Sequence, residues 1–293
     1  MADNSIWLLE YARVVEQPLG SVIAGKFNQG CVAIPFCYAV IKGEGHVAMV
    51  DVGYDDAGYG KQLADLSGCS LWQPPAEVLK AVDLRPGDVD TVFITHAHFD
   101  HVGNVRGFPN ARFFVQEREL SRWMWALSLP ERFTWIRNPV NPQNVYDLCQ
   151  LTAQHRLTLV EGMMEDVLPG IGLLPAHDTH SFGCQYVMVN NQSGAGKGPW
   201  VFVGDNLMSY ENVCGIEGDG FYRPTGLCHC DSVKLVLSID ELIERAGGNE
   251  RRLILSHAEE SWHVFPSWEG PHGLHIAEVC LAPGQSSFAP KDA

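Results

Sequence analysis

The sequence has few basic side chains, no uninterrupted run of 18 apolar residues and no internal repeat. In 293 residues, 20 lysines and arginines stand against 35 aspartates and glutamates, which gives a net charge of −15. Negative charge of this size repels nucleic-acid phosphates and anionic lipids, so we expect neither nucleic acid nor a membrane as a partner. Without a long apolar run, no segment is expected to span a membrane. Apolar residues still make up 46% of the chain, which excludes intrinsic disorder and suffices for a large core.

The first residues also lack the basic and apolar stretches of a secretory signal, so we expect a cytoplasmic protein. The nine cysteines are odd in number and widely scattered, which favours reduced thiols over a disulfide framework. Cys228-His229-Cys230 contains metal-binding residue types, but no partner pair follows at zinc-finger spacing. We therefore interpret this triplet as a structural loop.

Strand and helix patterns alternate along the chain without a low-complexity linker, which predicts one α/β domain over residues 1–293. The clearest helix covers 232–245, and residues 128–149, with three prolines, have the least regular pattern. On one face of that helix we expect Val233, Val236, Ile239 and Ile243. The other predicted helices are 57–65, 75–81 and 117–127, and the predicted strands are 6–14, 32–41, 47–52, 89–95, 112–115, 157–160, 171–174, 185–189, 200–203 and 252–256.

A dense group of potential metal ligands follows one of these strands. Residues 96–101, His-Ala-His-Phe-Asp-His, place three imidazoles and one carboxylate within six positions. Imidazole nitrogen and carboxylate oxygen are ligands for zinc and related divalent ions. At a strand end, His96 and His98 can point in one direction, and a turn after them brings Asp100 and His101 to a second position nearby. This spacing can therefore supply two adjacent metal ions.

This segment resembles the His-x-His-x-Asp-His signature of the metallo-β-lactamase superfamily. Weaker segments follow in the order of that family: Met-Val-Asp-Val-Gly at 49–53, Val-Phe-Val-Gly-Asp at 201–205 and Leu-Ile-Leu-Ser-His at 253–257. The resemblance implies a four-layered αβ/βα sandwich with two divalent metal ions, expected to be zinc, at one edge. It implies that Asp51 supports the site by hydrogen bonding. It also implies one metal held by His96, His98 and His180, a second held by Asp100, His101 and His257, and a bridge by Asp205.

The middle histidine of the family pattern has two candidates in this sequence. Matching on Pro-Ala-His selects His177, whereas matching on His-Ser-x-Gly and the following strand selects His180. The second match accounts for more of the segment, so we expect His180 to bind metal and His177 to lie beside the site. Cys184 occupies a position where many members have a second histidine.

The layout is most similar to the acyl-homoserine lactonase-like group, which implies that a metal-bridging hydroxide opens a small lactone or cyclic amide. Asp100 and Asp205 are then the catalytic carboxylates. Members of that group place a tyrosine three residues after the bridging aspartate, but this chain has Met208 there. Its nearest tyrosine is Tyr210, which we expect at the substrate pocket. The alternatives are hydrolysis of a thioester or carbon–halogen bond on the same site, or a non-catalytic binding protein.

Aromatic side chains are concentrated between residues 120 and 150, which predicts a cap that forms an aromatic wall beside the site. Trp123 belongs to this segment, and Trp262, which follows the last ligand, is expected at the same pocket. Such aromatic side chains equally suit a core or a homodimer interface. In either case the expected partner at the metals is a small-molecule substrate.

Overall fold

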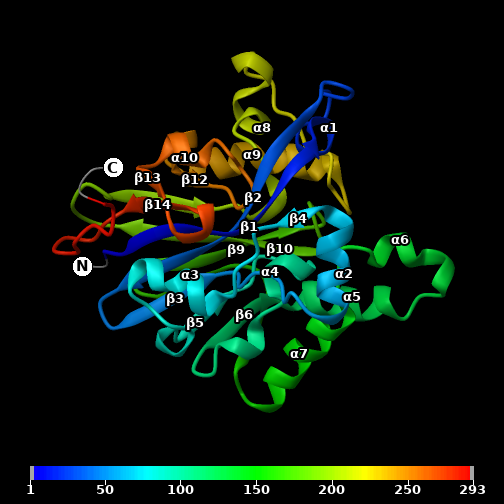
Figure 1. The fold of residues 1–293 in the computed structure, drawn as a ribbon, viewed down its shortest axis with the longest axis horizontal. Helices are drawn as coiled ribbons and strands as arrows, with labels where there is room; N and C mark the ends of the chain where they lie inside the picture. Colours follow the sequence, from blue (N-terminus) through cyan, green and yellow to red (C-terminus); the bar gives the residue numbers. More distant parts are fainter. Residues whose placement is uncertain (1–2, 291–293) are drawn as a thin grey trace.

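The computed structural model describes residues 3–290, and two stacked mixed sheets form its centre (Figure 1). The first sheet has the order β13-β14-β1-β2-β3-β5-β6-β7, with β4 paired to β1. Its strands are β1 (Ser5–Pro18), β2 (Cys31–Gly43), β3 (His46–Val50), β4 (Cys69–Ser70), β5 (Thr91–Phe93), β6 (Arg112–Gln116), β7 (Leu157–Val160), β13 (Ser267–Glu269) and β14 (His275–Cys280). The second sheet has the order β12-β11-β10-β9-β8. Its strands are β8 (Met164–Leu168), β9 (Ile171–His177), β10 (Gly183–Asn191), β11 (Gly198–Phe202) and β12 (Leu253–Ile254).

Helices cover the outer faces of the stacked sheets (Figure 1). They are α1 (Leu19–Val22), α2 (Gly58–Ser67), α3 (Pro75–Val78), α4 (Phe99–Val102), α5 (Glu117–Leu127), α6 (Thr134–Arg137), α7 (Pro142–Ala153), α8 (Glu211–Cys214), α9 (Ser232–Arg245) and α10 (Ser261–Val264). Within residues 3–290, none of these helices has both the length and the apolar composition needed to cross a membrane.

Three separate apolar clusters hold the layers together. One lies between the sheets and includes Ile41 and Val187. A second joins the first sheet to α2, α5 and α7, and a third joins the second sheet to α9 through Ile239 and Leu242. The order helix, sheet, sheet, helix agrees with the predicted layered α/β architecture, because each amphipathic element buries its apolar side against a neighbour.

Three details of the secondary structure differ from the sequence prediction. Residues 142–153 form α7, although most of them belong to the segment 128–149 that was expected to be irregular. The helix can begin at Pro142 because a proline in the first turn gives up no helical hydrogen bond. The side chain of Asn141 caps this helix by accepting from the backbone N–H of Gln143. In α9 the buried face contains Leu235, Ile239 and Leu242.

The face predicted for α9 is therefore out of phase at its first residue, since the side chain of Val233 is 66% exposed. Asp231 caps the helix by accepting from the N–H groups of Val233 and Lys234, which fixes the phase from the first turn. Strands β8, β13 and β14 were not predicted. All three lie at or near sheet edges, where alternation between buried and exposed residues is weak.

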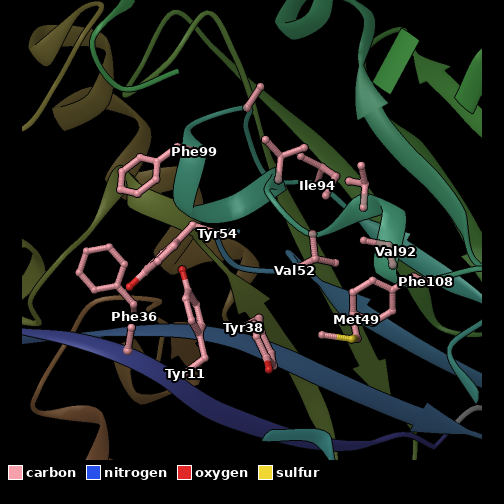
Figure 2. Packing of buried hydrophobic residues seen from close by; sticks show 14 of the residues in the cluster. Tyr11, Phe36, Tyr38, Met49, Val52, Tyr54, Val92, Ile94, Phe99 and Phe108 are labelled. Carbon is pink, nitrogen blue, oxygen red and sulfur yellow. The ribbon is translucent and has the colours of Figure 1, made fainter. Parts of the chain in front are cut away.

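The ends of several strands converge at one edge of the two sheets. Strands β3 and β5 are parallel neighbours in the first sheet, and β11 and β12 are parallel neighbours in the second. The loops that leave these four strands carry the predicted ligand motifs. Beneath α4, a buried aromatic group supports this edge, and the stacked rings of Tyr11 and Tyr38 lie 5.1 Å apart (Figure 2). The hydroxyl of Tyr11 donates to the backbone oxygen of Asp100 at 2.7 Å.

Candidate metal centre

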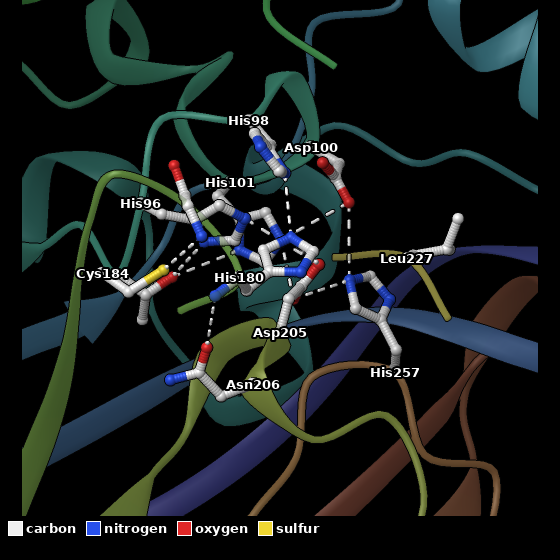
Figure 3. Close-up of polar contacts among 12 residues, drawn as sticks. His96, His98, Asp100, His101, His180, Cys184, Asp205, Asn206, Leu227 and His257 are labelled. Atoms are coloured by element: carbon white, nitrogen blue, oxygen red, sulfur yellow. Dashed lines mark hydrogen bonds and ion pairs between the residues drawn. The ribbon is translucent and has the colours of Figure 1, made fainter. Parts of the chain in front are cut away.

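Seven side chains from four segments, which follow β5, β9, β11 and β12, meet at this edge (Figure 3). They form two groups of ligand atoms, and within each group the atoms lie within 4.8 Å of one another. All seven side chains are buried, and Asp205 belongs to both groups. The first group is His96, His98, His180 and Asp205, and the second is Asp100, His101, His257 and Asp205.

The two carboxylate oxygens of Asp205 face different groups. Oδ2 lies 3.5 Å from His180 Nε2 and 3.8 Å from His96 Nε2. Oδ1 lies 3.1 Å from His101 Nε2 and 3.2 Å from His257 Nε2. One carboxylate is thus shared between two sets of nitrogen donors, which is the arrangement expected of a ligand that bridges two ions.

Hydrogen bonds on the outer side of three imidazoles fix their orientation. Nδ1 of His101 donates to Asp51 Oδ2 at 2.8 Å, and Nδ1 of His257 donates to the backbone oxygen of Pro35 at 2.8 Å. His96 Nδ1 lies 3.0 Å from the hydroxyl of Thr95, which itself donates to Asp51. With the proton on Nδ1, each ring presents a free lone pair on Nε2 to the centre.

These inward-facing atoms fit a metal ion. The Nε2 atoms of His96, His101 and His257, together with Asp205 Oδ1, are buried and have no hydrogen-bond partner among the described residues. His98 meets the first group through Nδ1, which lies 3.1 Å from His180 Nε2. Leaving a buried polar atom unpaired costs about 1–3 kcal/mol, so four such atoms around one point call for a ligand. Nitrogen and oxygen donors of this kind suit divalent ions such as zinc.

The backbone around the centre leaves no room for larger side chains. Asp51 adopts a left-handed conformation with φ of 63°, which lets its carboxylate accept from the backbone N–H of Thr95 at 2.7 Å. Gly204 also has a positive φ, and a β-carbon at this position would lie 3.1 Å from the Thr95 β-carbon. The loop that carries Asp205 therefore packs directly on the loop that carries His96.

The charges of the two groups differ. Burial lowers the pKa of His96 and His98 well below the ordinary value, and burial lowers that of His180 to about 4. Burial also lowers the pKa of His257, but the carboxylates of Asp205 and Asp100 outweigh it and raise the pKa to about 10. The imidazoles of the first group are therefore neutral at pH 7, whereas His257 carries a proton when no metal is bound.

This difference predicts that metal binding to the two groups depends differently on pH. Burial lowers the pKa of His101 as well, but the carboxylates of Asp205, Asp100 and Asp51 outweigh it and raise the pKa well above its ordinary value. A metal ion must therefore displace protons from both His101 and His257, so the apparent affinity of the second group should fall as the pH drops below about 10. For each displaced proton, the apparent zinc affinity falls about tenfold for every unit by which the pH is lowered. The first group should show no such loss until the pH approaches about 4. Calorimetric zinc titrations in buffers of different ionisation enthalpy count the released protons, and equal release by both groups would contradict this assignment.

The two candidate histidines of the middle segment lie in different surroundings. His180 joins the first group, and its backbone N–H donates to the Asn206 side chain at 3.1 Å. His177 is the last residue of β9, and its Nε2 lies 3.1 Å from the Oε1 atom of Gln116. His177 belongs to neither group of ligand atoms.

A pocket of about 550 Å³ opens beside the ligands. Its walls are largely apolar, and Met208 forms part of them. The aromatic ring of Phe36 packs edge-on against the imidazole of His257 with centroids 4.6 Å apart. The lining residues are Val14, Glu16, Gln17, Pro18, Ile34, Phe36, Tyr59, Leu63, Leu66, Ser67, His98, Phe99, Asp100, Asn138, Pro139, Asp205, Met208, Leu227, His229 and His257.

Three residues predicted at the pocket do not line it. Tyr210 donates its hydroxyl to the backbone oxygen of Leu253 at 2.8 Å, so it points into the second sheet. Trp262 packs in the apolar cluster between the sheets and stacks on His275 at 5.0 Å. Trp123 is fully buried behind the imidazole of His98, with ring centroids 5.7 Å apart, and therefore supports a ligand from outside the pocket.

The predicted aromatic wall is likewise absent from the pocket lining. From residues 120–150, only Asn138 and Pro139 contribute to it. The ring of Trp135 is 67% exposed and stacks on His229 with centroids 5.4 Å apart. The lining aromatic side chains come from other elements, because Phe36 lies on β2 and Tyr59 on α2.

Two residues that the sequence analysis did not assign to the site lie beside it. His229 lines the pocket, and its ring lies 5.3 Å from that of His98. The triplet Cys228-His229-Cys230 forms no part of either group of ligand atoms. Glu119 is a fully buried carboxylate that contacts the loops on both sides of the first group. No sequence motif marks it, and two of its four hydrogen-bond donors are backbone groups.

Comparisons with known proteins agree with this geometry. A family model described as the metallo-beta-lactamase superfamily matches residues 33–257. The N-acyl homoserine lactonase AttM of Rhizobium johnstonii is 24% identical over 262 residues, which cover 82% of this chain and 89% of that protein. AttM of Azorhizobium caulinodans is 31% identical over 106 residues, which cover 32% of this chain and only 40% of that protein. Among solved structures, the dizinc quorum-quenching lactonase AidC, in complex with N-hexanoyl-L-homoserine, matches with a TM-score of 0.63 at 15% identity and covers 92% of each chain.

Proposed function

The chain belongs to the metallo-β-lactamase superfamily, and from this premise we propose that it is a dinuclear metal-dependent hydrolase that opens a small, uncharged cyclic ester. The observation that carries the proposal is the position of Asp205 between two groups of buried donors. Those donors, together with the pocket beside them, provide both a place for two ions and a place for a substrate.

Divalent ions, which we propose to be zinc, supply a Lewis acid and water that is activated at neutral pH when they are bound. The side chains of this protein determine where that chemistry takes place. His96, His98 and His180 would hold one ion, while Asp100, His101 and His257 would hold the other. Asp205 would fix their separation, and Asp51 keeps His101 in the tautomer that exposes its Nε2 lone pair.

The pocket favours a substrate without negative charge away from the reacting bond. Within the part of the chain that the structure describes, no lysine or arginine lines the pocket, and Glu16 adds a negative charge of its own. An anionic group in the apolar part of the pocket would lose its hydration without gaining a counter-ion. This argues against substrates that carry a carboxylate or phosphate away from the reacting bond, and it supports a neutral ring with an apolar substituent.

The names of the relatives suggest the ring. The matched AttM proteins are described as N-acyl homoserine lactonases, and AidC was solved with the product N-hexanoyl-L-homoserine. Met208, which lines the pocket in the position of the tyrosine expected from the family, offers no hydroxyl to the substrate. Its sulfur accepts from the Thr225 hydroxyl at 3.1 Å. We therefore propose a lactone that is held mainly by the metal centre and by apolar contact.

A panel of substrates tests this function. The zinc-loaded protein should hydrolyse N-hexanoyl homoserine lactone or a related γ- or δ-lactone with kcat/KM of about 10⁴ M⁻¹s⁻¹ or more. Two anionic compounds, a β-lactam with a free carboxylate and a thioester of glutathione, should each be turned over much more slowly. Removal of metal with a chelator should abolish the activity, and zinc should restore it. Hydrolysis of the thioester in preference to every lactone would contradict the proposal.

A further inference from the structure

A buried carboxylate on α5 connects the loops that carry the first group of ligands. The side chain of Glu119 is fully buried and belongs to neither group of ligand atoms. It accepts four hydrogen bonds from groups on three different parts of the chain. The donors are the backbone N–H of Ala97 at 2.8 Å, the indole N–H of Trp123 at 2.7 Å, the hydroxyl of Ser181 at 2.7 Å and the backbone N–H of Gly183 at 2.5 Å.

The positions of these donors relate Glu119 to three imidazoles. Ala97 lies between His96 and His98 in the sequence, and Ser181 directly follows His180. Oε1 of Glu119 accepts from both Ala97 and Ser181, so one oxygen atom links the two loops. A carboxylate that accepts several N–H and O–H groups forms strong, charge-assisted hydrogen bonds.

The packing around Glu119 leaves little freedom for these loops to move independently. A β-carbon on Gly183 would lie 2.3 Å from the backbone nitrogen of Glu119, so only glycine permits this approach of α5 to β10. The indole of Trp123, which donates to Glu119, packs edge-on against His98. The carboxylate and the indole therefore hold His98 from the side opposite the pocket.

We propose that Glu119 is a positioning residue that sets the separation of His96, His98 and His180, and thereby the affinity of one of the two metal ions. The inference rests on the proposed metal-dependent function but not on the identity of the substrate. It is specific to the first group. The imidazoles of the second group are held by Asp51 and by the backbone oxygen of Pro35, neither of which contacts Glu119.

The experiment is a zinc titration of the metal-free protein by competition with a chromophoric chelator. His98→Ala and His257→Ala identify which binding event belongs to which group. Glu119→Gln keeps the shape of the side chain but replaces an acceptor with an amide N–H that faces other donors. We expect it to weaken the event of the first group by about 10–100-fold and to leave the other event unchanged. When cobalt replaces zinc, the visible absorption of the ion in the first group should differ between Glu119→Gln and the unmodified protein.

Two further variants separate positioning from general stability. Glu10 is another buried carboxylate, which accepts from Arg13 and from the backbone N–H of His275, and it belongs to neither group of ligand atoms. Glu10→Gln should lower the melting temperature but change neither zinc affinity. Ser181→Ala removes a single hydrogen bond to Glu119 and should weaken zinc binding to the first group a few-fold. This variant provides the test if Glu119→Gln does not fold.

The outcomes distinguish this inference from the proposed function. If the unmodified protein binds fewer than two zinc ions, the dinuclear function itself fails. If it binds two but Glu119→Gln weakens both events equally or neither, the positioning role of Glu119 is overturned. If neither Glu119→Gln nor Ser181→Ala weakens the event that His98→Ala removes, the inference is likewise overturned.

Discussion

Asp205→Ala is expected to lower turnover by about 10³-fold or more, because several kcal/mol of transition-state stabilisation depend on both ions. Each oxygen of this carboxylate faces one group of donors, at distances of 3.1–3.8 Å from the four imidazole nitrogens. Among residues 3–290, no other side chain belongs to both groups. Without Asp205, the two sets of ligands have nothing to hold them at a fixed separation, so the variant should also retain less metal.

The control for this variant is Asp240→Ala, which removes an exposed carboxylate on α9 that accepts from the Tyr222 hydroxyl. It should retain both metals and normal turnover. Turnover of the best lactone, zinc content and thermal unfolding of the metal-free proteins should be measured together. Near-normal turnover and zinc content in Asp205→Ala would show that Asp205 does not bridge the ions.

His180→Ala is expected to remove zinc from the first group and nearly all activity, whereas His177→Ala should retain both ions. The structure places His180 among the ligand atoms and leaves His177 half-buried, beside the side-chain amide of Gln116. Loss of a direct ligand removes a bond to the metal. A residue outside the ligand set can change affinity or activity by roughly 10–100-fold only through its neighbours.

The two histidines are three residues apart, so each variant serves as the control for the other. Zinc content and turnover should be compared for both under metal-replete conditions. If His177→Ala loses the metal and His180→Ala retains it, the assignment of the middle ligand is off by three residues. If both retain two ions, the first group requires a different set of ligands.

The sequence predicts the ligand motif well because local spacing determines it. His96, His98, Asp100 and His101 follow a strand and a turn whose geometry places them in two directions. The choice of His180 over His177 could also be made from the sequence, since the glycine and strand that follow His180 agree with the family pattern. The turn at Asp51 was expected to support the site, and its hydrogen bond to His101 is what the structure contains.

Features that depend on contacts distant in sequence could not be predicted in this way. Glu119 accepts from Ala97, Ser181 and Gly183, which are 22 to 64 residues away, and the backbone N–H groups of Ala97 and Gly183 carry no sequence signal. Tryptophans near the motifs were expected at the pocket, but Trp262 fills the space between the sheets instead. Hydrophobicity alone does not say which of two apolar environments buries an aromatic side chain.

Anomalous diffraction from crystals of the zinc-loaded protein can show whether the Asp205 carboxylate joins two metal ions. We expect two peaks per chain about 3.5–4 Å apart. One peak should lie among His96, His98 and His180, and the other among Asp100, His101 and His257, with an oxygen of Asp205 bonded to each. A single peak per chain under zinc-replete conditions, or two peaks with Asp205 bonded to only one, would contradict this arrangement.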